Sequence, residues 1–226
     1  MQYQTTVRGR FLSRPNRFIA HVEVDGAPVV CHVKNTGRCR ELLTPGATVI
    51  LAAATNPLRK TPYDLVAVYK GDRLINMDSQ APNEAVAEWL NRTDAFGRID
   101  TVRREYTHGR SRLDFYLVAE ERPLLLEVKG VTLEEDGVAL FPDAPTQRGT
   151  RHLRELTEAA LSGHAAAVLF VIQMDVCRHF SPNRATDPAF AEALACAASA
   201  GVRILAATCR VTERSLSVAD FVEVRL

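Results

Sequence analysis

The chain has 226 residues, of which 46% are hydrophobic and 24% charged, and its formal net charge is +1. These proportions are typical of a globular protein of one or two domains that can bury a core. No apolar run approaches the roughly 18 residues of a membrane-spanning helix, and no signal peptide is visible after Met1, so we expect a cytoplasmic protein without a membrane anchor.

The cysteines also favour a location in the cytoplasm. There are five, an odd number, and they are widely spaced without a Cys-x-x-Cys pair, at positions 31, 39, 177, 196 and 209. This pattern predicts reduced thiols and argues against a disulfide framework or a zinc site.

The first third of the chain is typical of a small β-barrel. Apolar enrichment or alternation predicts five short strands, at residues 7–12, 18–24, 29–33, 47–53 and 65–69, and a short helix is expected at 37–43. Turn sequences such as Asp25-Gly26 and Thr44-Pro45-Gly46 separate them. We therefore predict an OB-like barrel over residues 1–80, a fold often used to hold nucleic acid or sugars.

From residue 81 the pattern changes to mixed α/β. Helices are predicted at 84–90, 147–161 and 188–200, the second with Thr146 as N-cap and Gly163 after its end. Strands are predicted at 102–107, 113–118, 124–131, 165–172 and 202–208. The expected fold class is thus α/β (mixed), with an OB-like barrel followed by an α/β domain over residues 81–226.

The two strands at 113–118 and 124–131 carry the most informative residues. If their hairpin turns between Glu120 and Glu121, paired positions sum to 241, and Asp114 faces Glu127 at about 5 Å between Cβ atoms. A register shifted by one residue would undo this match. Lys129 lies two residues beyond Glu127 and shares its face of the strand.

Two opposed carboxylates among apolar residues need a cation or a proton to be tolerable. Mg²⁺, or Mn²⁺ in its place, is the predicted cofactor, because a hard ion takes oxygen ligands and bridges to phosphate. A lysine beside it can activate the attacking water, and lysine is a rare choice in a chain with 24 arginines and 4 lysines. The competing interpretation is a surface ion pair between Glu127 and Lys129.

Further residues could support such a site. Arg148 and His152 are i, i+4 neighbours on the predicted helix and, with Arg112, are candidates for binding phosphate; a solvated basic helix face is the alternative. Additional carboxylates could come from Glu84, Glu88 or Glu105, although ordinary solvated glutamates are the simpler interpretation.

Several segments together resemble the sugar fermentation stimulation protein A family. They are Asn35-Thr36-Gly37, Asn56-Pro57, SRLDF at 111–115, EVKGVTL at 127–133, FPDAPTQRG at 141–149 and HLREL at 152–156. The resemblance implies an OB-like domain joined to a PD-(D/E)xK, restriction-endonuclease-like domain, DNA binding with little sequence preference, and a link to maltose utilisation.

By the same resemblance, Asp114, Glu127 and Lys129 are the catalytic residues, with Asp114, Glu127 and Val128 as metal ligands. Leu113 replaces the proline that gives the superfamily its name. The 35–37 segment continues as Arg38-Cys39-Arg40 rather than with smaller or more apolar residues, so no role is assigned to this loop.

Two hypotheses of different classes follow. The first is a Mg²⁺-dependent phosphodiesterase that acts on DNA. The alternative is a non-catalytic DNA-binding regulator of sugar-metabolism genes, and a third, simpler option is a barrel that binds sugar or RNA. A homodimer stays open, because a double-strand cut would need two copies of the site.

Overall fold

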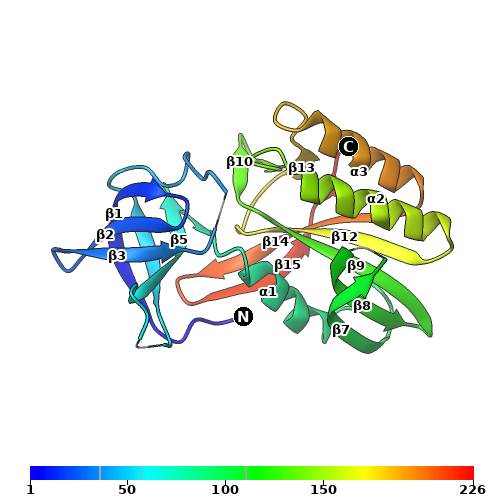
Figure 1. Cartoon of the computed structure of the whole chain (residues 1–226), viewed down its shortest axis with the longest axis horizontal. Helices are drawn as coiled ribbons and strands as arrows, with labels where there is room; N and C mark the ends of the chain where they lie inside the picture. The colour runs from blue at the N-terminus through cyan, green and yellow to red at the C-terminus, as the bar shows by residue number, and fades with distance from the viewer. Residues whose placement is uncertain (36, 57, 110) are drawn as a thin grey trace.

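The computed structural model describes residues 1–35, 37–56, 58–109 and 111–226. It has two parts, a β-barrel formed by the N-terminal third and a larger layer of sheet and helices (Figure 1). The predicted α/β class with an N-terminal OB-like barrel is confirmed. Within the described ranges, no helix is long and apolar enough to cross a membrane.

The barrel is one six-stranded sheet whose order is β3-β2-β1-β4-β5-β6. Its strands are β1 (Thr6–Asn16), β2 (Ile19–Val24), β3 (Ala27–Val33), β4 (Thr48–Ala53), β5 (Tyr63–Lys70) and β6 (Arg73–Asn76). A parallel pairing of β3 with β5 closes it. The five predicted strands are confirmed, and β6 was missed because it is four residues long and offers too short a pattern.

The helix expected at 37–43 is wrong. Only one turn forms there, in which Leu42 and Leu43 donate to the carbonyl of Cys39. Cys39 itself has φ 43°, outside the helical region, and Pro45-Gly46 follows at once. A segment of this length cannot gain enough hydrogen bonds to offset helix nucleation.

The second part is built on a six-stranded mixed sheet of order β15-β14-β12-β9-β8-β7. Its elements are α1 (Ala81–Leu90), β7 (Ile99–His108), β8 (Ser111–Ala119), β9 (Arg122–Val131), α2 (Gln147–Leu161), β12 (Ala165–Ile172), α3 (Pro188–Ser199), β14 (Arg203–Thr212) and β15 (Ser215–Phe221). All the helices and strands predicted after residue 80 form, and Thr146 caps α2 by accepting from Gly149 N at 3.0 Å.

A small four-stranded sheet stands beside the main one and was not predicted. It consists of β10 (Leu133–Glu135), β11 (Val138–Phe141), β13 (His179–Pro182) and β16 (Glu223–Val224). Strands of two to four residues carry no readable alternation, so their pairing is decided by tertiary contacts.

The predicted hairpin register is confirmed over the paired residues of β8 and β9, which run from Phe115–Leu126 to Ala119–Arg122. Glu120 and Glu121 form its two-residue turn with φ angles of 49° and 65°. Positive φ at both central residues matches the right-handed twist of the flanking strands.

The two faces of the main sheet are covered differently. On β12, Val168 and Phe170 belong to the same buried cluster as Leu153 and Leu156 of α2. Leu169 and Val171 belong to a second cluster with Ala85 and Val86 of α1. Helix α2 therefore covers one face and α1 the other, which explains why the apolar run 165–172 is uninterrupted.

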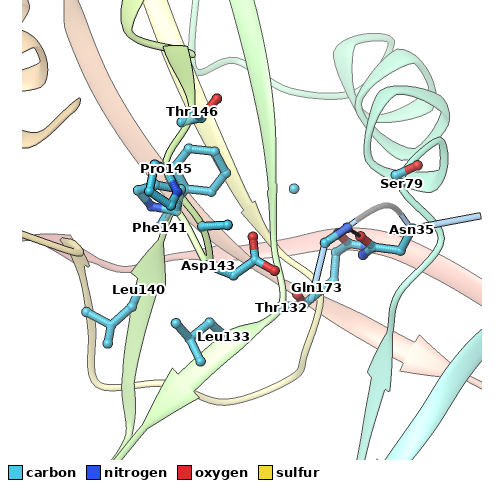
Figure 2. Close-up of a pocket in the computed structure, with 14 residues that line it drawn as sticks. Asn35, Ser79, Thr132, Leu133, Leu140, Phe141, Asp143, Pro145, Thr146 and Gln173 are labelled. Carbon is cyan, nitrogen blue, oxygen red and sulfur yellow. Dashed lines mark hydrogen bonds between the residues drawn. The ribbon is translucent and has the colours of Figure 1, made fainter. Parts of the chain in front are cut away.

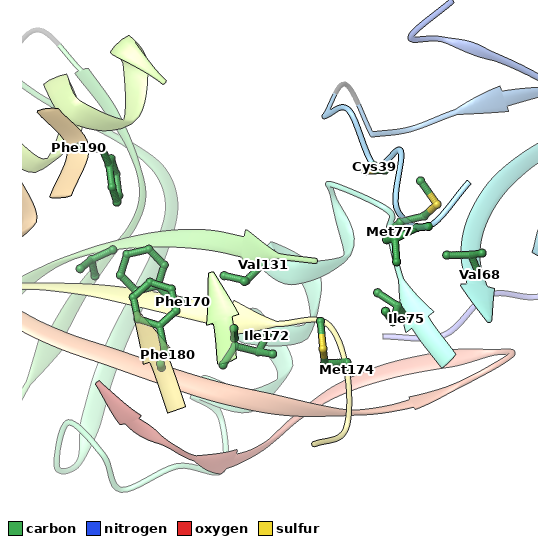
Figure 3. Close-up of a cluster of buried hydrophobic side chains, with 14 of the residues drawn as sticks. Cys39, Val68, Ile75, Met77, Val131, Phe170, Ile172, Met174, Phe180 and Phe190 are labelled. Carbon is green, nitrogen blue, oxygen red and sulfur yellow. The ribbon is translucent and has the colours of Figure 1, made fainter. Parts of the chain in front are cut away.

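The first of these clusters extends into the barrel. Val68 and Met77 of the barrel side share it with Ile172 and Met174 of the second part (Figure 3). The two parts are therefore joined through a continuous apolar core rather than by a linker alone.

Candidate active site

Asp114 lies where β8 and β9 separate, one residue before the first pair of their ladder. Its Oδ2 accepts a hydrogen bond from Val128 N at 2.8 Å, in the place a backbone carbonyl would otherwise occupy. Its Oδ1 accepts from Asn83 Nδ2 of α1 at 2.7 Å. Each carboxylate oxygen has two lone pairs, so both can still accept a further ligand.

Glu127 is buried, with 2% of its surface exposed, and its two oxygens have different surroundings. Oε1 is held by Lys129 Nζ and by Nδ1 of His152 on α2. Oε2 is buried and has no hydrogen-bond partner within the part of the chain that the structure describes. A buried unpartnered carboxylate oxygen is costly, and a cation is one partner that can satisfy it.

Burial raises the pKa of Asp114, and the neighbouring charge of Glu127 raises it further, against the hydrogen bond from Val128 N. Burial would also raise the pKa of Glu127, but the hydrogen bond from His152 and the charge of Lys129 outweigh it and hold that pKa below its ordinary value. Two carboxylates and one ammonium leave a net negative site, which a divalent cation would complement.

Lys129 shares the α2 face with Glu127. Their register partners on β12 are Phe170 and Val168, both in the cluster that packs on α2. The Lys129 side chain is 13% exposed, so its ammonium is close to solvent but held in place by Glu127. This geometry leaves the ammonium on the same side of β9 as the carboxylate of Glu127.

The residues fit a magnesium-type ion that keeps several waters. Asp114 offers a carboxylate and Glu127 offers the unpartnered Oε2, while Val128 could contribute only its backbone carbonyl, since its side chain packs in the α1 cluster. Over the described ranges, no group of three or more His, Cys, Asp or Glu side chains is arranged to hold a metal. Mg²⁺ commonly uses one or two carboxylates plus substrate phosphate, so two suffice.

The three residues expected to bind phosphate differ in their exposure to solvent. Arg148 is exposed on the first turn of α2, and its Nε lies 3.5 Å from His152 Nε2. His152 is 3% exposed and faces Glu127, so it does not lie on a solvated basic helix face, which was the alternative. Arg112 is exposed and lies 3.5 Å from Glu105.

The three additional carboxylates each have a basic partner. Glu84 accepts from Arg104 at 2.9 Å, and Glu88 accepts from the N-terminal ammonium of Met1 at 2.6 Å. Glu105 is paired with Arg112 and is exposed. None of these three accompanies Asp114 and Glu127 in a metal-holding group among the described residues.

Sequence reasoning missed Asn83 and underused His152. Asn83 stands at the start of α1, 31 residues before Asp114, and no motif links the two positions. His152 was recognisable as a neighbour of Arg148, but its contact with Glu127 depends on the packing of α2 across β9, which spacing along the chain does not give.

Two cavities have a lining residue that contacts or directly follows a residue of the site, although Asp114, Glu127 and Lys129 line neither of them. One, of about 340 Å³, is lined by Asn83, Glu84, Arg104 and Lys34. The other, of about 350 Å³, begins at Gly130, the residue after Lys129, and is shown in Figure 2. Ser79, at the joint between the barrel and the second part, lines both cavities.

Comparisons with known proteins agree with one another. The family model "Sugar fermentation stimulation protein RE domain" matches residues 80–215, and "SfsA N-terminal OB domain" matches residues 12–77. A relative from Desulfitobacterium hafniense (strain Y51), called "Sugar fermentation stimulation protein homolog", is 56% identical over 100% of this chain and 99% of its own. One of the same name from Ruminiclostridium cellulolyticum is 50% identical over the whole of both chains.

A solved structure is also similar. It is described as "The structure of Pyrococcus Furiosus SfsA in complex with Ca2+", has a TM-score of 0.91 and 26% identity, and is matched over 100% of this chain and 98% of that one.

Proposed function

The chain belongs to the sugar fermentation stimulation protein family, and from that premise and its carboxylate site we propose that it is a divalent-metal-dependent phosphodiesterase acting on DNA. The observation that carries the proposal is the buried, unpartnered Oε2 of Glu127 beside the carboxylate of Asp114. A protein that only grips DNA has no need of this arrangement, because two buried carboxylates repel a polyanion.

The structure of the Pyrococcus furiosus relative is described as a complex with Ca²⁺. We propose that this chain also binds a divalent ion, which Asp114, Glu127 Oε2 and the Val128 carbonyl would hold. When bound, such an ion polarises the phosphoryl group and lowers the pKa of water. Asn83 and His152 fix the two carboxylates so that their oxygens are oriented before the ion arrives.

Lys129 is the remaining catalytic group. Its ammonium already donates to Glu127 Oε1, so it stands beside the carboxylate and can donate to an attacking water or to a phosphate oxygen that gains charge. A lysine can also take the proton from that water, which arginine cannot do. Arg148, exposed one turn from His152, is suited to hold an adjacent phosphate.

DNA is proposed as the polymer because a phosphodiester between nucleotides presents the charges that Lys129 and Arg148 can bind. Lys34 of the barrel lines the cavity on the Asn83 side, where its ammonium is paired with Asp78 at 2.9 Å. The surface arginines at Arg8 and Arg10 are paired with Glu213 and Glu23, so the barrel does not offer them freely to a phosphate backbone.

The test is a cleavage assay on supercoiled, linear and single-stranded DNA with Mg²⁺, Mn²⁺, Ca²⁺ or EDTA. We expect cleavage by the wild type with Mg²⁺ or Mn²⁺ and none by an Asp114→Ala/Glu127→Ala variant prepared in parallel. An Asp72→Ala variant, changed at an exposed turn of the barrel, should cut like the wild type. DNA binding without cleavage under every metal would contradict the proposal and favour a DNA-binding regulator.

A further inference from the structure

The cavity that begins at Gly130 has one wall from each part of the molecule. Asn35 and Ser79 face Phe141, Pro145 and Thr146 across it (Figure 2). It lies beyond the carboxyl ends of the parallel strands β9 and β12, where ligands commonly bind in α/β folds.

The two walls are held together by Asp143. Its Oδ2 accepts from Arg38 N of the barrel at 3.0 Å. At Gly37, an added Cβ would come within 2.5 Å of that same oxygen, so the close approach depends on glycine. The cavity is therefore a property of the closed arrangement of both parts.

Gln173 supplies a fixed polar group in the lining. It is 1% exposed, and its Nε2 donates to Asn76 Oδ1 at 2.8 Å and to Asp78 O at 3.1 Å. Its carbonyl Oε1 receives no hydrogen bond from any described residue. This oxygen lies against Gly130, where a Cβ would come within 2.5 Å of it. The lining thus presents a fixed acceptor oxygen to which no described residue donates.

The lining chemistry distinguishes between possible ligands. Among the described lining residues the only charged side chain is Asp143, so a phosphate group would meet repulsion and no cation. The rest combines amide and hydroxyl groups (Asn35, Thr132, Ser79) with an apolar wall that includes Phe141. A flat, uncharged heterocycle with donors and acceptors along its edge fits such a lining.

We propose that this cavity receives one unstacked nucleobase of the substrate strand, while the adjoining phosphate lies at the Asp114, Glu127 and Lys129 site. The choice of a nucleic acid as the ligand rests on the proposed function. The cavity lining includes Gly130, which follows Lys129 on β9, and Thr146, the N-cap of the helix that carries Arg148 and His152. The preferred substrate is then a strand with an unpaired base at the cut, in single-stranded DNA or at a frayed end.

The experiment compares two fluorescent ten-nucleotide strands, one of thymidine and one of abasic sites, bound in Ca²⁺ and checked for integrity afterwards. Anisotropy gives the affinity of each strand for the wild type and for Ala144→Leu, which narrows the cavity from its lining. Ala144→Ser keeps the space at the same position, and Ala185→Leu makes the same change at an exposed residue that does not line the cavity.

We expect Ala144→Leu to weaken binding of the thymidine strand about tenfold and to leave the abasic strand unchanged. Ala144→Ser and Ala185→Leu should bind both strands like the wild type. Thermal unfolding of each variant separates a local effect from misfolding. The proposal is wrong if Ala144→Leu still prefers the thymidine strand over the abasic strand as strongly as the wild type does. It is also wrong if the affinity for both strands falls equally.

The outcome is separable from that of the proposed function. Cleavage by the wild type together with an unchanged base preference in Ala144→Leu would leave the nuclease standing and overturn the cavity assignment. Cavity-dependent base binding without cleavage under any metal would support the cavity and overturn the nuclease.

Discussion

The two carboxylate oxygens of Glu127 differ in their hydrogen bonding. Oε1 is occupied by His152 and Lys129, which fixes the carboxylate, and Oε2 is left buried without a partner among the described residues. The carboxylate is therefore oriented by the protein before any ligand arrives. His152 is a positioning residue here, because it reaches the site only through Glu127.

We predict that His152→Asn weakens Mn²⁺ binding about 10- to 100-fold, since loss of a group that orients a metal ligand has effects of this size. Isothermal titration with Mn²⁺ measures it directly. His164→Asn, at an exposed histidine at the far end of α2, is the matched control and should bind like the wild type. An unchanged affinity in His152→Asn would show that Glu127 needs no support from α2.

For individual residues, the sequence predicted which positions lie close together within one hairpin. The positions of Asp114 and Glu127 follow from a turn at Glu120-Glu121 and the period of two along a strand. Asn83 was out of reach, because its contact with Asp114 depends on where α1 packs. The metal-binding and catalytic roles themselves stay predictions.

Among the elements, the turn of the β8–β9 hairpin is strained in a way that serves its register. Glu120 and Glu121 both have positive φ, a conformation that costs a residue with a Cβ about 1–2 kcal/mol. The cost is offset by the ladder beside the turn, whose register places Asp114 and Glu127 directly beyond its last pair, Phe115 and Leu126.

Glu121→Gly is therefore expected to raise the free energy of unfolding by about 1 kcal/mol. Urea denaturation measures the change. Glu135→Gly, at an exposed position of β10, is the control and should lower stability instead, because its backbone has no positive φ and glycine weakens a strand. A loss of stability in Glu121→Gly would contradict this account of the turn.

The closure of the barrel carries a pH dependence. Asp64 of β5 lies beside His32 of β3, with His32 Nδ1 at 3.0 Å from Oδ1, and Arg59 donates to both of its oxygens. Burial would raise the pKa of Asp64, but the hydrogen bonds from Arg59 and His32 outweigh it and hold that pKa below its ordinary value. A lowered folded pKa adds stability above the ordinary pKa, and this stability is lost as the pH falls through the lowered value.

Asp64→Asn should thus lower the free energy of unfolding at pH 7 by about 2 kcal/mol, and the difference from the wild type should shrink below about pH 4. Urea denaturation at pH 7 and pH 3 gives both values. Asp72→Asn, at an exposed turn of the same barrel, should show no such difference at either pH. A gap that persists at pH 3 would mean that the carboxylate charge is not its cause.

Element prediction succeeded where the pattern was long. Helix α2 has the predicted bounds because its apolar stripe and Thr146 cap agree, and β12 has the predicted bounds because seven of its eight apolar residues are buried together. The short strands β6, β10, β13 and β16 have too few residues to show a period. Their existence depends on neighbours that are distant in sequence.

For the whole molecule, the important feature is the joint between barrel and second part. Apolar residues of both share one cluster, and Gln173 links the end of β12 to Asn76 of β6. Asn76 N also donates to the carbonyl of Gln173 at 2.9 Å. The sequence predicted the fold of each part but not the contact between them. No pattern within either part shows which of its surfaces faces the other part.

We predict a single calorimetric unfolding transition for the wild type, because a shared core couples the two parts. Gln173→Ala should lower the free energy of unfolding by about 2 kcal/mol, since it removes the donor to Asn76 Oδ1 and Asp78 O in a buried site. Gln147→Ala, exposed on α2, is the control and should change little. Two separate transitions in the wild type would contradict the coupling.

The central claim is that Lys129 completes a metal-dependent hydrolytic site with Asp114 and Glu127. The most direct measurement is the initial rate of single-stranded DNA cleavage in Mn²⁺ by the wild type and by Lys129→Met, with Mn²⁺ affinity measured on the same preparations. We expect a rate at least 100-fold lower in Lys129→Met, on the scale of losing a charge-stabilising donor, and a Mn²⁺ affinity reduced by no more than that of His152→Asn, because His152 still holds Glu127 Oε1. Equal cleavage rates in the two proteins would show that this lysine takes no part and that the site is not the one that cuts.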